Sequence, residues 1–197
     1  MKLNSESFPF GGRIPSRCAF GQLGPDRRQS VSAENLNPHL SWSEVPEGTQ
    51  SFVIACLDDD VPTDFTDRDR LGDLLASQTR RRFVHWVQIN VPADLRTIAE
   101  GALKDKCAPG FGRPGINDYS RGEPVSLGEV GSGYDGPNPP AQDARWHGYR
   151  FIVHALDVAE LSLPEAFTWQ ETQKAMQGHV LASAEWVGFY SQNPRLV

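Results

Sequence analysis

The stretch that decides the fold is residues 51–57, SFVIACL. Six apolar residues follow Ser51 without a break, and phenylalanine, valine and isoleucine lead the run. A continuous apolar run of this length and composition is typical of a strand buried on both faces. Residues 58–62, DDDVP, come next, and the change to acidic residues predicts that the strand ends there. We therefore expect a β-rich core built around this strand.

Three further strands are predicted downstream, at residues 83–90, 149–156 and 185–190. Alternate side chains of a strand point to the same face of its sheet. In the first of these strands, alternation places four residues on one face: Phe83, His85, Val87 and Ile89. In the second it places four others together: Tyr149, Phe151, Val153 and Ala155.

Glycine and proline separate these segments. The chain has 18 glycines and 15 prolines among 197 residues, which favours short strands and turns over long helices. Residues 8–20 are expected to form an edge strand with a turn. Thr168 and Glu171 form a capping-box pattern that predicts the start of a helix, which Gly178 weakens or interrupts. We predict a single, mostly β domain over residues 1–197, with one or two peripheral helices.

The composition limits what the protein binds and where it works. There are 25 acidic and 19 basic residues, and the net charge of −6 argues against a general nucleic-acid-binding protein. No apolar run is long enough to span a membrane, and the first residues lack the apolar core of a secretory signal. Cys18, Cys56 and Cys107 are widely spaced, which argues against disulfides or a thiolate zinc site. We expect a cytoplasmic protein without a cofactor or metal.

A charged segment at residues 64–82 separates two of the strands and contains four aspartates and five arginines. Three leucines in it have helical spacing, so a short helix is one interpretation. Its last residues, Arg80, Arg81 and Arg82, lead directly into the strand that carries His85. We hypothesise a mobile flap that adds positive charge at the mouth of a site, and a solvated loop without a role is the alternative.

A stiff loop precedes the strand at 149–156. Residues 131–151 read GSGYDGPNPPAQDARWHGYRF. Glycines let a backbone come close to a ligand, whereas prolines fix the φ angle, so this loop is rigid. It delivers His147 and Tyr149 onto the next strand, which suits one wall of a pocket. The alternative is a connection between strands that binds nothing.

Acidic, imidazole and phenol side chains interrupt the apolar pattern in three places. Asp58 and Asp60 follow the buried strand, His85 lies on an otherwise apolar strand face, and His147 and Tyr149 are two residues apart. We expect Asp58 to lie close to His85 and to raise its pKa. His147 has no assigned acid, so its pKa should stay near the ordinary value or fall. The predicted result is a small concave site for an anion, bound more tightly as pH falls from about 8 to 6.

Other interpretations of these residues remain open. An inward-facing histidine is more often a core residue with its hydrogen bonds satisfied, and the aspartates can form a turn with Asx-type bonds. Two aspartates and two histidines also match a metal site. The sequence has no GxSxG nucleophile elbow, HExxH zinc motif, P-loop or dinucleotide-binding fingerprint.

An ordered set of short motifs resembles the phosphatidylethanolamine-binding proteins, and in particular their bacterial and archaeal Raf-kinase-inhibitor-like (YbhB/YbcL) branch. The resemblance covers about residues 8–190. The motifs follow in this order: Asn37-Pro38-x-Leu40-Ser41-Trp42, Val45-Pro46-x-Gly48-Thr49-x-Ser51, Asp58-x-Asp60-x-Pro62, His85-Trp86-Val87, Asn117-Asp118, Gly133-Tyr134-x-Gly136-Pro137-x-Pro139-Pro140 and His147-x-Tyr149-x-Phe151.

The resemblance implies a Greek-key β-sandwich with a peripheral helix and an anion pocket. The cavity residues that it implies are Asp58, Pro62, His85, Pro139, Pro140 and His147. Four neighbours in the same motifs complete our set of candidate ligand-binding residues: Asp60, Tyr134, Gly136 and Tyr149. Family members bind phosphate-like head groups, eukaryotic members also bind protein kinases or transcription partners, and the bacterial branch is often dimeric.

This sequence departs from the family pattern in several places. Asp59 stands where the family usually has proline, and Gly148 where it has arginine. The segment 64–82 is long, and the seven residues after Tyr190 predict no C-terminal helix of the eukaryotic kind. We therefore expect a non-catalytic protein that binds a small anion or phosphate head group, and a regulatory role through an unidentified protein partner is a further interpretation. The alternatives are a hydrolase that uses Asp58, His85 and His147, and an interaction protein whose pocket has no ligand.

Overall fold

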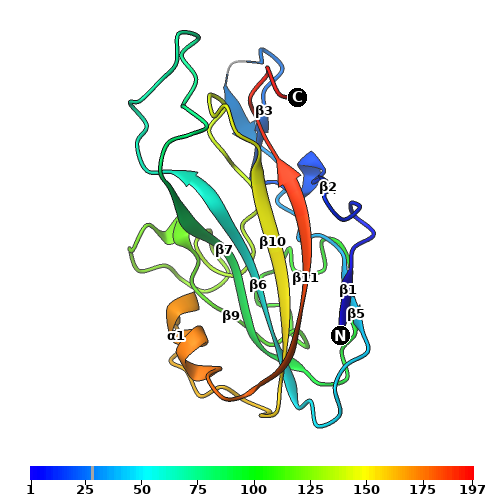
Figure 1. The fold of residues 1–197 in the computed structure, drawn as a ribbon. Helices are drawn as coiled ribbons and strands as arrows, with labels where there is room; N and C mark the ends of the chain where they lie inside the picture. The colour runs from blue at the N-terminus through cyan, green and yellow to red at the C-terminus, as the bar shows by residue number, and fades with distance from the viewer. Residues whose placement is uncertain (28) are drawn as a thin grey trace.

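The chain folds around a sheet of long strands (Figure 1). The computed structural model describes residues 1–27 and 29–197, and within them the largest sheet has six strands in the order β2-β11-β10-β6-β7-β9. All neighbours are antiparallel except β2, which runs parallel to β11. The strands are β2 (Gly12–Arg13), β6 (Ser51–Pro62), β7 (Arg80–Pro92), β9 (Arg113–Pro114), β10 (His147–Leu156) and β11 (Val180–Tyr190).

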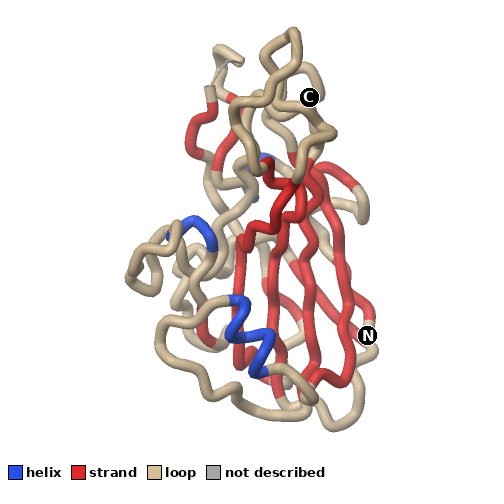
Figure 2. Tube along the Cα trace, turned by 60° about the vertical axis from the view of Figure 1, so that its left-hand side comes forward, coloured by secondary structure: helices blue, strands red, loops and turns tan. Residues whose placement is uncertain are grey.

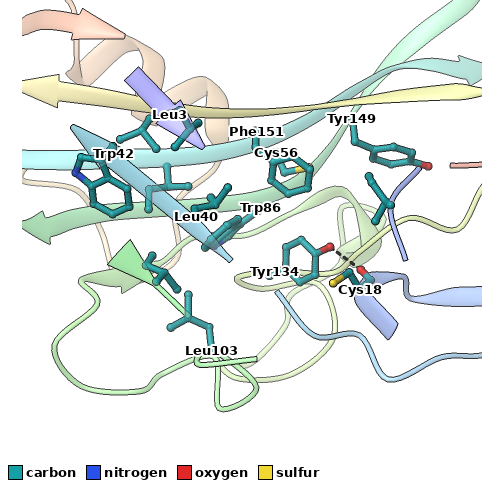
Figure 3. Close-up of a cluster of buried hydrophobic side chains, with 14 of the residues drawn as sticks. Leu3, Cys18, Leu40, Trp42, Cys56, Trp86, Leu103, Tyr134, Tyr149 and Phe151 are labelled. Carbon is teal, nitrogen blue, oxygen red and sulfur yellow. Dashed lines mark hydrogen bonds between the residues drawn. The ribbon is translucent and has the colours of Figure 1, made fainter. Parts of the chain in front are cut away.

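A smaller sheet packs against one face of the large one. Its strands, in the order β1-β5-β8, are β1 (Lys2–Asn4), β5 (Leu40–Ser43) and β8 (Thr97–Ile98). Leu40 and Trp42 of β5 share a buried cluster with Cys56 of β6 and Phe151 of β10 (Figure 3). The side chains predicted to share a face of β10 all lie in this cluster, which confirms the alternation there. A separate pair of strands, β3 (Gly21–Leu23) and β4 (Ser30–Ser32), lies outside both sheets.

The connections within the large sheet follow a Greek key. β6 and β7 are consecutive and pair, β9 pairs with β7, and β10 returns to pair with the other edge of β6. The order β10-β6-β7-β9 is therefore that of a four-stranded Greek key. Both the β-sandwich and its connectivity agree with the fold expected from the sequence.

The other face of the large sheet carries the helix α1 (Trp169–Ala175) (Figure 2). Thr168 and Glu171 form the predicted capping box, each side chain bonding the other residue's backbone N–H. Phe167, Trp169 and Met176 pack against side chains of β6 and β7 in a second buried cluster. The helix ends at Ala175, and Gly178, three residues further on, adopts a φ of +82°, which a glycine tolerates at the least cost. No helix of the described residues is long and apolar enough to cross a membrane.

The central strands are longer than their apolar runs. β6 does not end at the aspartates but continues to Pro62, and β7 begins at Arg80 rather than Phe83. β10 starts at His147 and β11 at Val180. Backbone hydrogen bonds do not depend on side-chain polarity, so the pairing of β6 with β7 extends beyond the buried segment of each strand.

A β-bulge at His85 overturns the predicted alternation along β7. Trp86 pairs with Cys56, but the next pair is Val84 with Leu57, so His85 is an extra residue without a partner. Both His85 and Trp86 consequently lie on the inner face. Val87 and Ile89, which we expected beside His85, belong to the cluster on the opposite face.

The segment between β6 and β7 forms an extended loop rather than a helix at the predicted leucines (Figure 1). Leu74 is only 1% exposed, its N–H donates to Gln142 and its carbonyl oxygen accepts from Ala144. The Arg195 guanidinium bonds the buried carboxylate of Asp73. The segment is thus attached to the body of the domain by its second half, which does not support a flap that is free along its whole length.

Candidate functional site

A cavity of about 730 Å³ opens where β6, β7 and β10 meet the proline-containing loop. The short 3₁₀ helix η2 (Asp118–Ser120) and the residue after it form another side. The lining residues are Asp58, Val61, Phe65, Arg81, Phe83, His85, Asp118, Tyr119, Arg121, Gly122, Asn138, Pro139, Pro140, His147 and Tyr149. Sequence reasoning identified six of these as site residues: Asp58, His85, Pro139, Pro140, His147 and Tyr149.

A buried chain of alternating charges forms the base of the cavity. His147 lies between two carboxylates, with Nδ1 at 2.7 Å from Asp58 Oδ2 and Nε2 at 3.0 Å from Asp143 Oδ2. The guanidinium of Arg80 then forms two hydrogen bonds with the Asp143 carboxylate. Two carboxylates are therefore matched by two cations, which is how buried charges are tolerated.

The partners of His147 correct one prediction. Burial alone would lower its pKa, but hydrogen bonds to Asp143 and Asp58 outweigh burial and raise the pKa to about 9. The same contacts, with help from Arg80, hold the pKa of Asp143 below its ordinary value despite burial. His147 is therefore an imidazolium at neutral pH, not a histidine that titrates near its ordinary value. Because both of its N–H groups are taken by carboxylates, it has none left to donate to a ligand.

His85 differs from the prediction in the opposite direction. Its Nδ1 lies 2.8 Å from the carbonyl oxygen of Asp135 and 3.1 Å from that of Gly136, so Nδ1 carries the proton and donates. Burial lowers the pKa of His85 in spite of the nearby Asp58. The distance from Nε2 to Asp58 Oδ2 is 4.0 Å, too long for a hydrogen bond. Asp58 lies near His85, as expected, but its hydrogen bond is with His147, for which no acidic partner was predicted.

Among residues 1–27 and 29–197, two buried polar atoms of the cavity have no hydrogen-bond partner. They are Nε2 of His85 and the hydroxyl oxygen of Tyr149. The two rings are in edge-to-face contact, with their centroids 5.1 Å apart. Buried polar groups are usually paired, and a pair left open side by side in a cavity indicates a place for a ligand.

Aromatic and basic side chains surround the mouth of the cavity. Phe65, from the segment predicted to cover the site, lines it with half of its surface exposed. Arg81 lies over the ring of Phe83, and Arg121 follows η2 with a left-handed backbone. Of the three arginines predicted near the site, Arg81 alone lines the cavity. Arg80 is buried against Asp143, and Arg82 pairs with Asp59.

The loop that carries the prolines is held by a buried ion pair that sequence reasoning missed. Lys106 Nζ lies 2.6 Å from Asp135 Oδ1, and the other carboxylate oxygen accepts from Asn117 and from the N–H of Gly131. Asn35 donates to the same carboxylate. Asp135 stands in the stretch whose rigidity we noted, but its partners come from three distant segments. The sequence does not indicate a buried lysine here, since Lys106 directly follows the charged residues Lys104 and Asp105.

Four residues expected at the site lie outside the cavity. Asp60 accepts from the Gly148 N–H and pairs with Arg145, because an extra residue in β6 between Asp58 and Val61 turns it away. Pro62 lies beyond this bulge, and Val61 lines the cavity instead.

Tyr134 and Gly136, the other two of these four residues, lie behind the cavity wall and support it. Tyr134 is a core residue whose hydroxyl donates to the carbonyl oxygen of Cys18 (Figure 3). Gly136 presents its carbonyl oxygen to His85 and to the Tyr119 hydroxyl. A Cβ at Gly136 would come within 2.2 Å of the Cys18 carbonyl oxygen, so this close approach needs glycine.

Residues 191–197 form a turn behind the proline wall. Gln192 donates to the carbonyl oxygen of Pro139, and Asn193 donates to that of Asp143. These contacts fix the loop that carries Pro139 and Pro140, although the sequence analysis assigned no role to this segment.

The aspartates and histidines of this region also matched a metal site in the sequence. Within residues 1–27 and 29–197, no group of three or more His, Cys, Asp or Glu side chains is arranged to hold a metal ion. The two carboxylates nearest the cavity base are already bonded by His147.

The sandwich and its cavity define a class of protein. A family model described as phosphatidylethanolamine-binding protein matches residues 4–191. The chain belongs to the phosphatidylethanolamine-binding protein family. Within the family it lies in the bacterial and archaeal YbhB/YbcL branch, as the motif order indicated.

Relatives and solved structures support this placement. The UPF0098 protein YbhB of Escherichia coli is 32% identical over 191 residues, which cover 97% of this chain and 100% of YbhB. A UPF0098 protein of Aquifex aeolicus is 31% identical, with 98% and 90% covered. The crystal structure of E. coli YbcL, titled a new member of the mammalian PEBP family, matches with a TM-score of 0.71, 25% identity and coverage of 96% and 97%. A putative phosphatidylethanolamine-binding protein homologue from Chlamydia trachomatis gives a TM-score of 0.68, 29% identity and 96% coverage of both chains.

Proposed function

We propose that the protein is a non-catalytic binding protein whose cavity takes a small oxyanion, such as inorganic phosphate or a phosphate head group. The observation that carries the proposal is the pair of unpartnered polar atoms, His85 Nε2 and the Tyr149 hydroxyl, on two rings that are in edge-to-face contact at the cavity. Family membership supports the same ligand class.

Charge at the cavity favours an anion. The buried charges of Asp58, Asp143, His147 and Arg80 balance one another. At the mouth, Arg81 and Arg121 stand near a single carboxylate, Asp118, whose oxygen accepts from the backbone of Val84. The net charge of these groups is positive, which concentrates anions even though the whole protein is acidic.

The lining residues also favour binding over hydrolysis. Neither a serine nor a cysteine stands among the residues that line the cavity in the described part of the chain, so a side-chain nucleophile of the common kinds is missing. The imidazole that is bonded to a carboxylate, His147, has both nitrogens occupied and cannot accept a proton from a substrate.

The test is titration calorimetry with inorganic phosphate, comparing Arg121→Ala with Arg13→Ala. Arg121 lines the cavity, whereas Arg13 lies over the ring of Trp146 at a different surface. Arg121→Ala should weaken phosphate binding roughly 3- to 30-fold, the effect of losing an exposed to partly desolvated charge contact. Arg13→Ala should leave it unchanged. No phosphate binding at millimolar concentration, or equal effects of the two substitutions, would overturn the proposal.

We propose the cellular compartment of the protein from its cysteines. Cys18, Cys56 and Cys107 are free thiols, and Cys107 is exposed. Burial raises the pKa of the Cys18 thiol to about 12, which makes it unreactive. An exposed free thiol suits a reducing compartment, so we place the protein in the cytoplasm.

A further inference from the structure

We infer that the cavity selects an oxyanion that itself carries a hydroxyl group, because the neutral His85 presents an acceptor, not a donor, to the ligand. This inference rests on the proposed function and narrows its ligand class to hydrogenphosphate and singly protonated phosphomonoesters. Oxyanions of the same shape without an O–H are expected to bind poorly.

The position of the proton on His85 follows from its neighbours. Two backbone carbonyl oxygens face Nδ1, and a carbonyl oxygen can only accept, so the ring proton stays on Nδ1. The remaining nitrogen, Nε2, then has a lone pair directed into the cavity and no partner. Carbonyl oxygens fixed by the backbone make this tautomer a property of the fold.

The surroundings of His85 Nε2 also favour a ligand atom that donates a hydrogen bond. Asp58 Oδ2 lies 4.0 Å away, and this oxygen is an acceptor that already receives the His147 N–H. Two acceptors at this separation repel a bare anionic oxygen, whereas a hydroxyl between them can donate to Nε2. The Tyr149 hydroxyl, also unpartnered, can donate to another oxygen of the same ligand.

The charged and titratable groups around His85 do not place a second proton on its imidazole ring. Asp58 of β6 and His147 of β10 face it with opposite charges, and the phenols of Tyr119 and Tyr149 contact its ring. Burial raises the pKa of both phenols, so they stay neutral. Burial lowers the pKa of His85, which agrees with a neutral imidazole at physiological pH.

The experiment compares three tetrahedral anions by titration calorimetry at about pH 7.5. Hydrogenphosphate has an O–H, whereas sulfate and monofluorophosphate carry the same two charges without one. Phosphate should bind at least about tenfold more tightly than either analogue, since an unmatched buried acceptor is expensive. Similar affinities for all three would overturn the inference while leaving the proposed function intact. Absence of binding by all three would overturn both.

Two substitutions separate the acceptor from the rest of the site. His85→Asn keeps a short donor near the Asp135 carbonyl but removes Nε2, so the preference for phosphate over sulfate should fall towards one. Tyr149→Phe removes a donor that every oxyanion can use, so it should weaken phosphate and sulfate by the same factor and keep the preference. A preference that survives His85→Asn, with the variant folded by circular dichroism, would contradict the assignment.

A spectroscopic readout is independent of any ligand. Long-range ¹⁵N–¹H NMR of the free protein should show His85 protonated at Nδ1 and unprotonated at Nε2 at about pH 7.5. An imidazolium, or a proton on Nε2, would overturn the inference whatever the affinities show.

Discussion

At the scale of single residues, the two histidines of the cavity have exchanged the roles that the sequence suggested. His147 sits between Asp58 and Asp143 and is charged, whereas His85 is bonded to backbone carbonyls and is neutral. The reason is that backbone carbonyl oxygens of Asp135 and Gly136 hold His85 at the bulge, while a turn brings Asp143 to the far side of His147. Spacing along the chain cannot reveal either feature.

The charged His147 makes the stability of the protein depend on pH. Its folded pKa of about 9 lies above the ordinary value of roughly 6.5, so the folded state binds the proton more tightly. The contribution is complete below about pH 6.5 and is lost as pH rises through about 9. Compared with His147→Gln, the wild type should lose an extra 2–3 kcal/mol or so of unfolding free energy between about pH 6.5 and 9.5.

Urea denaturation of both proteins at the two pH values measures this difference. Other groups titrate in the same range, but they do so in both proteins and cancel in the comparison. If the difference in unfolding free energy between the wild type and His147→Gln stays constant, or widens with rising pH, the pKa of His147 is not raised. The result also bears on ligand binding, since a histidine that stays charged from about pH 6 to 8 cannot cause a change in affinity over that interval.

At the scale of elements, the segment between β6 and β7 has two different halves. Phe65 stands half-exposed at the cavity mouth, whereas Leu74 is buried and bonded through its backbone to residues 142 and 144. Deleting residues 66–79 would therefore remove a packed side chain, so we expect the deletion to lower the thermal midpoint.

Two leucines three positions apart provide a matched test of this difference. Leu74 is 1% exposed and Leu71 is 69% exposed. Leu74→Ala should lower the unfolding free energy by about 2–4 kcal/mol, the usual cost of a cavity in a packed region. Leu71→Ala should change it by less than about 0.5 kcal/mol. Equal and small effects, measured by urea denaturation, would show that the whole segment is a loose flap after all.

At the scale of the whole molecule, Asp135 connects segments that are far apart in sequence. Its carboxylate accepts from Asn35, Lys106, Asn117 and the Gly131 backbone, and the last three of these contacts are buried. The same residue's carbonyl oxygen fixes the His85 tautomer. The Asp135 side chain thus adds to the other bonds between this loop and the N-terminal third of the chain, such as those of Tyr134 to Cys18 and of Gly136 to Asn35.

Breaking this ion pair should be strongly destabilising. Asp135→Ala leaves Lys106 as a buried charge without its carboxylate, bonded only to the carbonyl oxygens of Glu129 and Ser132, so we expect a loss of about 3–5 kcal/mol. Lys106→Met in the same protein removes the stranded charge and should recover part of the loss. The double variant, measured by urea denaturation with both single variants, should therefore be more stable than Asp135→Ala alone. A double variant that is less stable would show that the pair is not the main function of Lys106.

The fold was predictable from the sequence because long apolar runs and a capping box are local signals. The strand around residues 51–57, the alternation in β10 and the helix after Thr168 needed no tertiary information. The sandwich itself and the set of cavity residues came from the order of motifs. Tautomers, ion pairs and bulges were not predictable in this way, because Lys106, Asp143 and Arg80 acquire their roles only when distant segments meet.

The bulge at His85 also has a consequence for protein engineering. In a regular strand only every second side chain points inward. At any one level of the sheet, the strand therefore contributes one inward side chain, either to the core or to a pocket. The extra residue in β7 lets Trp86 fill the core and His85 face the cavity side by side. A designer who transplants this pocket into another sandwich must transfer the irregular register as well as the side chains. On a regular strand without the bulge there would be one inward position for these two consecutive residues, so only one of the two side chains could take it.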